Sequence, residues 1–120
     1  MKVFLVEDSV PIRERLVEMI VALGGHVIVG EADNFDDAVA GITSSHPDVA
    51  IFDIKLARGN GIEALATVKR VLPDLRGIVL SNYASPQHIK ASSEAGAEYF
   101  LDKSAEFEKI GQILESMESA

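Results

Sequence analysis

Apolar runs of strand length alternate with amphipathic helical patterns five times along the chain. Each run is apolar at nearly every position, and each is followed by apolar residues at spacings of three and four. Strands that are apolar on both faces must be covered on both faces, and their connections are right-handed almost without exception. The pattern therefore predicts an α/β fold, a doubly wound five-stranded parallel sheet. The expected strands are Val3–Val6, His26–Gly30, Val49–Phe52, Gly77–Leu80 and Tyr99–Leu101.

Helix start and stop signals lie between these strands. Ser9 should begin the first helix and Gly24-Gly25 should end it, because serine caps helix starts and glycine favours helix ends. Asn34 is the expected cap of the second helix, and Ser85-Pro86 opens the fourth. The last helix should bury Phe107, Ile110, Leu114 and Met117.

Composition narrows the class of protein. The chain has 120 residues, which predicts one domain over 1–120, and 48% of them are hydrophobic. It has no cysteine, which excludes disulfides and thiolate metal sites. No secretion signal or uninterrupted apolar run of membrane-spanning length, about 18 residues, is visible, so we expect a soluble, cytoplasmic protein without membrane insertion.

The net charge of −8 comes from 11 Lys+Arg against 19 Asp+Glu. Neutralising phosphates requires clustered cations, and the longest basic clusters here are pairs such as Lys69-Arg70. Direct binding of nucleic acid is therefore not expected.

Polar residues follow four of the expected strands. Strand one ends in Glu7-Asp8, strand three in Asp53, strand four in Ser81, and Lys103 follows strand five. Ligands of such sheets bind beyond the carboxyl ends of the strands. Three converging carboxylates repel one another unless a cation intervenes, and Mg²⁺ prefers such oxygen ligands. Carboxylates, a hydroxyl and a lysine around Mg²⁺ suit phosphoryl transfer to an aspartate.

Several short motifs occur in order at these strand ends. They are Val6-Glu7-Asp8, Pro47-Asp48-Val49 before Asp53, Gly61 eight residues later, Ser81, and Gly96–Lys103. With them the chain resembles the receiver domains of two-component response regulators, of the single-domain chemotaxis type, over essentially its whole length. The resemblance implies the flavodoxin-like strand order 2-1-3-4-5.

The resemblance also implies roles for residues. Asp53 would be the phosphoacceptor. Asp8 would bind Mg²⁺ directly, Glu7 directly or through water, and Lys55 only through its backbone carbonyl. Ser81 would hydrogen-bond the phosphoryl group and Lys103 would pair with it.

Two further pairs of residues are expected to act in signalling. Ser81 and Phe100 would form the switch, and Phe100 lacks the hydroxyl of the commoner Tyr. Lys55 and Tyr83 each lie two residues beyond a site residue, so we expect them to tune the lifetime of the phosphorylated state.

The implied partners are proteins. A histidine kinase or a histidine phosphotransfer protein would donate the phosphoryl group. A downstream effector would bind the face of the fourth helix, fifth strand and fifth helix, and a phosphorylation-linked dimer is a further expectation.

The chain departs from the family pattern at three more positions. Ala57 and Ser104 stand where proline is usual, which leaves the isomer of the Lys103–Ser104 peptide bond open. Asn82 replaces the usual small residue after Ser81 and would restrict access to the site.

Two other functions would need residues that this chain lacks at these positions. A flavin-binding protein would need a phosphate loop where Glu7-Asp8 stands, and a dehalogenase-type phosphatase would need an Asp where Lys55 stands. Two alternatives remain open: an interaction module that signals without phosphate, and the N-terminal fragment of a larger response regulator. His26, His46 and His88 share no ligand spacing, so each is expected at the surface.

Overall fold

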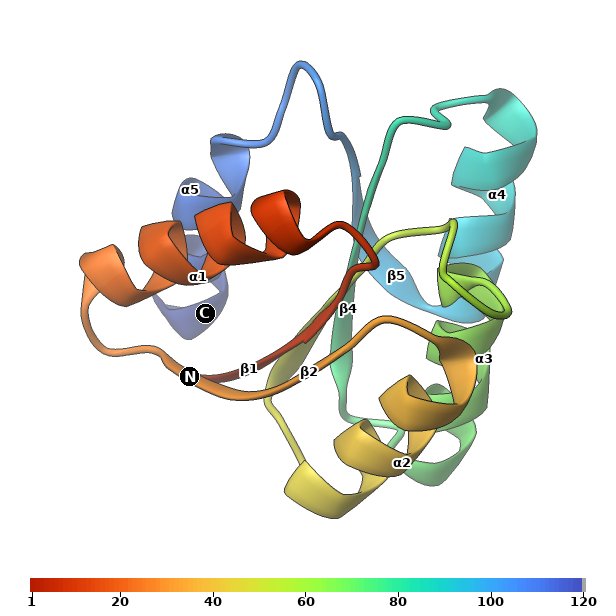
Figure 1. Ribbon diagram of the computed structural model, residues 1–120, viewed down its shortest axis with the longest axis horizontal. Helices are drawn as coiled ribbons and strands as arrows, with labels where there is room; N and C mark the ends of the chain where they lie inside the picture. The colour runs from red at the N-terminus through yellow and green to blue at the C-terminus, as the bar shows by residue number, and fades with distance from the viewer. Residues whose placement is uncertain (120) are drawn as a thin grey trace.

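A five-stranded parallel sheet in the order β2-β1-β3-β4-β5 forms the centre of the computed structural model, which describes residues 1–119 (Figure 1). Every strand pairing is parallel. The fold class and strand order expected from the sequence are confirmed. The strands are β1 (Lys2–Val6), β2 (Val27–Ala32), β3 (Val49–Phe52), β4 (Arg76–Ser81) and β5 (Ala97–Asp102).

One helix follows each strand. Within residues 1–119 none of them has the length and apolar character needed to cross a membrane. Ser9, Asn34 and Ser85 cap the helices that they were expected to cap, each accepting a hydrogen bond from a backbone N–H three residues later. The helices are α1 (Val10–Leu23), α2 (Phe35–Ser45), α3 (Gly61–Val71), α4 (Pro86–Ala95) and α5 (Lys109–Ser119).

The helices cover both faces of the sheet. In Figure 1, α1 and α5 lie on one side, and α2, α3 and α4 lie on the other. Successive residues of a strand point to opposite faces, so Val3 and Leu5 join the core under α1 and α5, while Phe4 and Val6 join the other core. All four side chains of β3 are buried, as a central strand requires.

Four strands differ from the sequence expectation at their ends, and the first of them, β1, begins at Lys2, one residue earlier than expected. β2 begins after His26 and extends to Ala32, β4 also includes Arg76 and Ser81, and β5 spans six residues instead of three. Glu31 and Glu98 interrupt the apolar runs without ending the strands, because Glu31 pairs with Leu5 and the pairing of β5 with β4 resumes at Tyr99 after a register shift at Glu98.

Phe107 and His26 also differ from expectation. Phe107 is buried but precedes α5, in the turn after Asp102, and the Arg15 guanidinium lies 4.3 Å from its ring centroid. The surface position expected for His26 is wrong, because its side chain is fully enclosed. His46 is exposed and His88 is half-buried.

Candidate functional site

The carboxyl ends of β1 and β3 lie side by side because Val6 pairs with Phe52. The next residue of each strand, Glu7 and Asp53, is therefore placed at the same edge of the sheet. The Asp53 N–H donates to the Val6 carbonyl at 2.8 Å, and the Glu7 N–H donates to the Ala32 carbonyl at 2.9 Å. These backbone hydrogen bonds fix the positions of the Cα atoms from which the Glu7 and Asp53 side chains extend.

Three carboxylates meet at this edge. One oxygen each from Glu7, Asp8 and Asp53 lies within 4.8 Å of the others. Glu7 and Asp53 are 2% and 6% exposed, whereas Asp8 is exposed. A set of carboxylate oxygens that opens to water on one side fits Mg²⁺, which is typically held by one or two carboxylates while keeping several waters. The structure thus brings together the three carboxylates that the sequence singled out.

The Lys103 ammonium lies between two of these carboxylates. Its Nζ is 2.7 Å from Glu7 Oε1 and 3.2 Å from Asp53 Oδ2. Burial alone would lower the pKa of Lys103, but the hydrogen bond to Glu7 and the charges of Glu7 and Asp53 outweigh burial and raise it. Lys103 is therefore a permanent positive charge in the pocket.

Burial also acts on the Glu7 carboxylate. Burial raises the pKa of Glu7 from 4.5 to about 7, and the nearby Asp53 charge adds to this, although hydrogen bonds from Lys103 and from the Ser9 N–H oppose it. The Glu7 carboxylate is thus costly to keep ionised, even beside Lys103, unless a further cation is bound.

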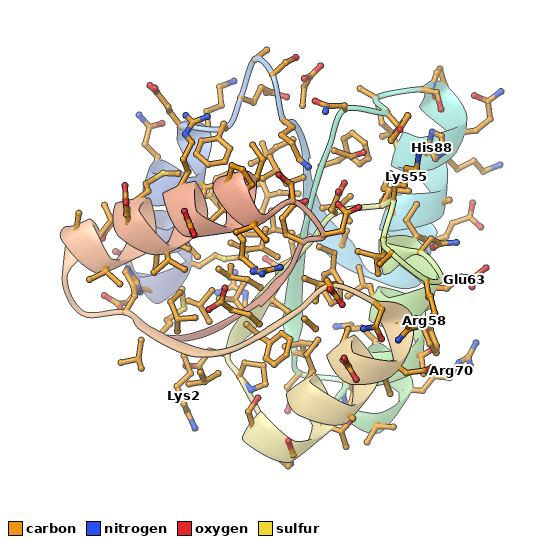
Figure 2. The ribbon with its side chains drawn as sticks, in the orientation of Figure 1. Lys2, Lys55, Arg58, Glu63, Arg70 and His88 are labelled. Atoms are coloured by element: carbon orange, nitrogen blue, oxygen red, sulfur yellow. The ribbon has the colours of Figure 1, made fainter. Side chains whose placement is uncertain are left out.

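A cavity of about 260 Å³ opens beside Asp53. Lys55 and Tyr83 line it, and both are exposed, so their side chains flank the carboxylate as expected. Figure 2 shows Lys55 and His88 at the same end of the molecule, beyond the carboxyl ends of the strands. The lining residues are Glu7, Asp8, Ser9, Ile12, Asp53, Lys55, Asn82, Tyr83 and Lys103.

The two expected switch residues do not line this cavity in the described chain, residues 1–119. Ser81 is fully buried, and its Oγ accepts a hydrogen bond from the Tyr83 N–H at 3.0 Å. Phe100 is half-buried and packs against the core under α2, α3 and α4.

The loop after Asp53 is closely packed, which explains Gly61. Lys55 forms a bridge with Asn60, and the Gly61 N–H donates to the Ile54 carbonyl at 2.8 Å. A Cβ atom at Gly61 would overlap the Asp53 carbonyl oxygen. Any other residue there would displace the backbone that carries Asp53.

The Lys103–Ser104 peptide bond is trans, as are all the peptide bonds of the described residues. Ser104 instead secures the turn through its side chain, because its N–H and Oγ both donate to Asp102 Oδ1, at 2.9 and 2.6 Å. These hydrogen bonds lower the pKa of Asp102. The isomer of the Lys103–Ser104 bond, which the sequence left open, is therefore trans.

Arg13 supports the site and was missed in the sequence. Its Nη1 donates to the Glu7 carbonyl at 2.8 Å, and its Nε lies 3.0 Å from Glu31 Oε1 on β2. Side chains of a helix point back toward its N-terminus, so an arginine in the first turn of α1 can reach the preceding loop. The position of Arg13 in the first turn of the expected helix was the feature of the sequence from which this contact could have been predicted.

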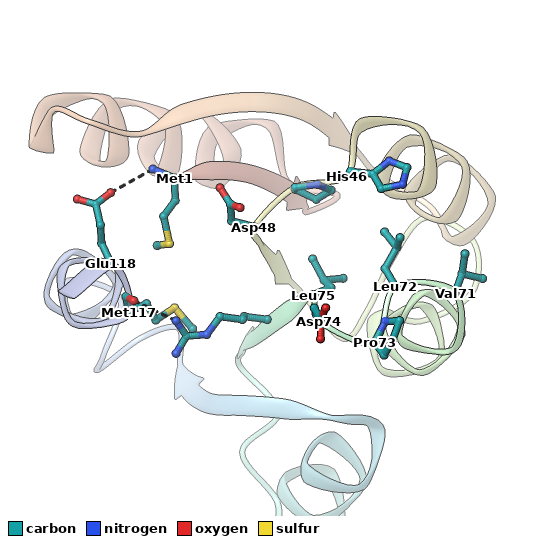
Figure 3. Close-up of a pocket in the computed structure, with 12 residues that line it drawn as sticks. Met1, His46, Asp48, Val71, Leu72, Pro73, Asp74, Leu75, Met117 and Glu118 are labelled. Atoms are coloured by element: carbon teal, nitrogen blue, oxygen red, sulfur yellow. Dashed lines mark hydrogen bonds and ion pairs between the residues drawn. The ribbon is translucent and has the colours of Figure 1, made fainter. Parts of the chain in front are cut away.

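Another cavity, of about 560 Å³, lies at the opposite edge of the sheet, at the amino ends of the strands (Figure 3). Two of its polar groups are already engaged. Asp48 Oδ2 accepts from the Lys2 N–H at 2.7 Å, and Arg76 is paired with Glu98 on β5. The carboxylates at the other edge therefore remain the stronger candidate for a functional site.

Comparison with known proteins agrees with the fold. The family described as "Response regulator receiver domain" matches residues 3–115. The chain is 37% identical over 102 residues to the DNA-binding transcriptional activator DevR/DosR of Mycobacterium tuberculosis, covering 85% of this chain and 47% of that protein. It is 27% identical to the chemotaxis protein CheY of Thermotoga maritima, covering 94% and 93% of the two chains.

A solved structure shows the same architecture. The signal receiver domain of the putative response regulator NarL from Mycobacterium tuberculosis superposes with a TM-score of 0.88 at 26% identity, covering 99% of this chain and 97% of that one. The chain therefore belongs to the receiver domain family of two-component response regulators. It spans about half the length of the first curated relatives that it matches, with 47% and 49% of their lengths covered.

Proposed function

We propose that this receiver domain accepts a phosphoryl group on Asp53 in the presence of Mg²⁺. The observation that carries the proposal is the convergence of Glu7, Asp8 and Asp53, two of which, Glu7 and Asp53, contact the Lys103 ammonium. Glu7, Asp8, Asp53 and the backbone carbonyl of Lys55 would hold the ion. When bound, Mg²⁺ would offset negative charge on the transferring group.

Asp53 is the carboxylate that is placed to act as the nucleophile. An oxygen of Asp53 would form a bond to phosphorus while the phosphorus–nitrogen bond of a phosphohistidine donor breaks, and the released imidazole nitrogen would take up a proton. Lys103 would pair with the new phosphoryl oxygens, and Ser81 would donate a hydrogen bond to one of them. Hydrolysis by water would later regenerate Asp53, so that the domain catalyses only its own phosphorylation and dephosphorylation.

The proposed donor is a histidine kinase or a histidine phosphotransfer protein, and the proposed output surface is formed by α4, β5 and α5. Tyr83, Ile89 and Tyr99 are exposed on or beside this surface, which gives an effector apolar groups to bury. The same surface could support a phosphorylation-linked dimer. The name of the DevR/DosR relative includes DNA-binding, and we infer such an activity only for a further domain of a longer protein, not for this acidic chain. Cytoplasmic action is proposed on the basis of the family.

Intact-mass spectrometry tests the proposal. Treatment with acetyl phosphate or phosphoramidate and Mg²⁺ should add one phosphoryl mass to the wild-type protein, and EDTA should suppress the addition. Asp53→Asn should abolish it, whereas Asp48→Asn, at the opposite edge of the sheet, should react normally. Equal labelling of wild type and Asp53→Asn would overturn the assignment. No labelling of the folded wild type would favour an interaction module that signals without phosphate.

A further inference from the structure

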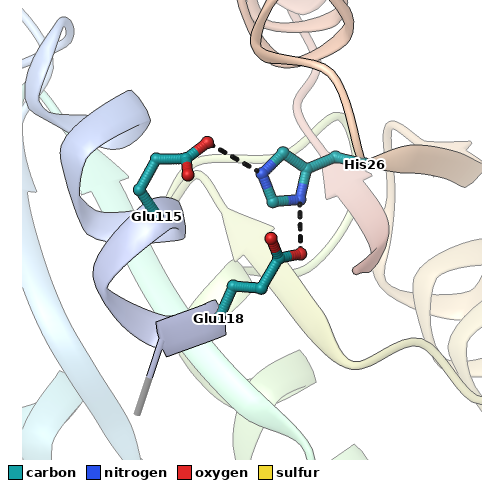
Figure 4. Close-up of side chains that lie close together, drawn as sticks. All are labelled: His26, Glu115 and Glu118. Atoms are coloured by element: carbon teal, nitrogen blue, oxygen red, sulfur yellow. Dashed lines mark hydrogen bonds and ion pairs between the residues drawn. The ribbon is translucent and has the colours of Figure 1, made fainter.

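A histidine and two glutamates meet near the amino ends of the strands, far from Asp53. His26 immediately precedes β2, and its side chain is fully enclosed, whereas Glu115 and Glu118 lie one turn apart on α5 with side chains 52% and 45% exposed (Figure 4). Nε2 of His26 lies 3.4 Å from Glu115 Oε1, and Nδ1 lies 3.8 Å from Glu118 Oε2. The imidazole is thus held between two carboxylates.

A positive group already lies against this cluster. The Met1 amino nitrogen is 3.2 Å from His26 Nδ1, 3.2 Å from Glu118 Oε2 and 2.8 Å from the Gly25 carbonyl oxygen. Figure 3 shows the contact between Met1 and Glu118. An imidazole nitrogen, a carboxylate and a carbonyl oxygen therefore face one position that attracts a cation.

We propose that His26, Glu115 and Glu118 form a second metal site, suited to a divalent transition ion such as Zn²⁺. Nitrogen ligation by an imidazole favours Zn²⁺, Ni²⁺ or Cu²⁺ over Mg²⁺, which prefers oxygen ligands. The site is distinct from the three carboxylates around Asp53, and it goes beyond the phosphoryl-accepting function proposed above.

The spacing of the three side chains suits such an ion after a small adjustment. One ligand atom from each residue lies within 4.8 Å of the others. Ligands at 2.0–2.2 Å from a tetrahedral ion are roughly 3.3–3.6 Å apart, so no separation in the set needs to contract by more than about 1.5 Å. Glu115 and Glu118 are half-exposed and long, so their rotamers can supply this movement while the buried His26 stays in place. Water or the neutral Met1 amine would complete the coordination.

Such an ion would join two distant parts of the chain. His26 belongs to the segment between α1 and β2, and the two glutamates lie in the last turns of α5. A ligand that binds only the folded state stabilises it. Zn²⁺ should therefore raise the unfolding temperature, without any requirement for a phosphoryl donor.

Metal titration of the intact protein tests this site. Zn²⁺ binding is followed by calorimetry, and Co²⁺ is followed by its visible absorption, both with excess Mg²⁺ to occupy the carboxylates around Asp53. His26→Gln should weaken Zn²⁺ affinity by at least about tenfold, since loss of even a supporting group costs 10–100-fold at metal sites. His46→Gln is the matched control, because His46 is exposed and lies outside the cluster, and it should bind like wild type.

A second variant keeps the test decisive if His26→Gln fails to fold. Glu115→Gln changes one exposed atom on the surface of α5 and should also weaken Zn²⁺ binding by about tenfold. A chain with a few residues added before Met1 should still bind, because the three side chains supply the site. Binding by His26→Gln equal to wild type, absence of binding by the wild type, or loss of all binding in the extended chain would each overturn the proposal. The cluster would then be a structural contact between α5 and the segment that joins α1 to β2.

Discussion

The Lys103 ammonium lies nearer to Glu7 than to Asp53, at 2.7 Å from Glu7 Oε1 and 3.2 Å from Asp53 Oδ2. In this conformation the lysine neutralises the carboxylates that we propose as metal ligands. A phosphoryl group on Asp53 would compete with Glu7 for the Lys103 ammonium. A divalent ion at Glu7 and Asp8 would favour that exchange, because it replaces the charge that Lys103 supplies.

Removing the lysine should therefore tighten metal binding in the unphosphorylated protein. We expect Lys103→Ala to lower the Mg²⁺ dissociation constant by about 3–10-fold, because a positive charge a few ångströms from the ion is lost. Calorimetric titration measures this directly. Lys55→Ala is the control, since Lys55 is an exposed lysine at the rim of the same cavity and should have a smaller effect. Weaker Mg²⁺ binding by Lys103→Ala would show that the lysine organises the ligands instead of competing with the ion.

Stability without metal should decrease as the pH rises through the titration of Glu7. The pKa of Glu7 is raised from 4.5 to about 7 by burial, so the folded protein holds this proton more tightly than the unfolded chain does. The unfolding free energy is therefore unaffected below about pH 4.5 and falls between there and pH 7. Glu7→Gln should remove this loss and raise stability at pH 8 by about 1–3 kcal/mol.

Urea unfolding in EDTA at pH 5 and pH 8 tests the expectation for Glu7. The gain from Glu7→Gln should be large at pH 8 and small at pH 5, and Mg²⁺ should stabilise the wild type more than the variant. Glu14→Gln is the control, because Glu14 is an exposed glutamate on α1. A gain of the same size at both pH values would assign the effect to packing.

The sheet and the positions of the carboxylates could be predicted from the sequence, but the side-chain contacts between helices and strands could not. Strand patterning placed Glu7 and Asp53 at one edge, because the carboxyl ends of adjacent parallel strands coincide. It did not predict that the Lys103 ammonium would lie closer to Glu7, at 2.7 Å, than to Asp53, at 3.2 Å, because this difference depends on the side-chain conformations. It also placed His26 at the surface, because its burial depends on α5, about 90 residues later in the chain. Long-range side-chain contacts leave no periodic signal in a sequence.

Arg13 should position the loop that carries Asp8. Its guanidinium is held by Glu31 and donates to the Glu7 carbonyl, so its loss would free the backbone between β1 and α1. We expect Arg13→Met to weaken Mg²⁺ binding by roughly 10-fold, the lower end of the effect of supporting groups at metal sites. NMR spectra should show shifted amide signals for Asp8 and Ser9. Arg15→Met is the control, because Arg15 contacts Phe107 instead of this loop, and unchanged Mg²⁺ affinity in Arg13→Met would remove Arg13 from the site.

Lys55 and Tyr83 should set how long the phosphorylated state lasts. Both line the cavity beside Asp53, where a water must align with phosphorus for hydrolysis. Replacing both with Ala should change the dephosphorylation rate several-fold, measured by mass spectrometry after the phosphodonor is removed. Lys90→Ala is the control, because Lys90 is an exposed lysine on α4. Decay at the wild-type rate in the double variant would mean that both side chains only face solvent.

The proposed switch between Ser81 and Phe100 would require more than one hydrogen bond. A shift from 1:99 to 99:1 needs about 5.5 kcal/mol of differential stabilisation, and one charge-assisted hydrogen bond supplies roughly 1.5–3 kcal/mol. Ser81 must also give up or share the contact that it now accepts from the Tyr83 N–H. The ion pair of Lys103 with the phosphoryl group and the repacking of Phe100 must therefore supply the remainder.

NMR titration with beryllofluoride and Mg²⁺ tests whether these contributions add up to a full switch. In the wild type, shifts should extend from Asp53 through Ser81 to Tyr99 and to His88 on α4. In Ser81→Ala they should be reduced on α4 and β5 but persist near Asp53, since the metal ligands are untouched. Phe100→Leu should keep the shifts at Ser81 and lose those on β5, because a smaller side chain cannot fill the space that Ser81 vacates. If wild-type shifts stay near Asp53 and Asp8 alone, then phosphorylation does not reach the proposed output surface, and the domain would pass its phosphoryl group on instead of changing shape.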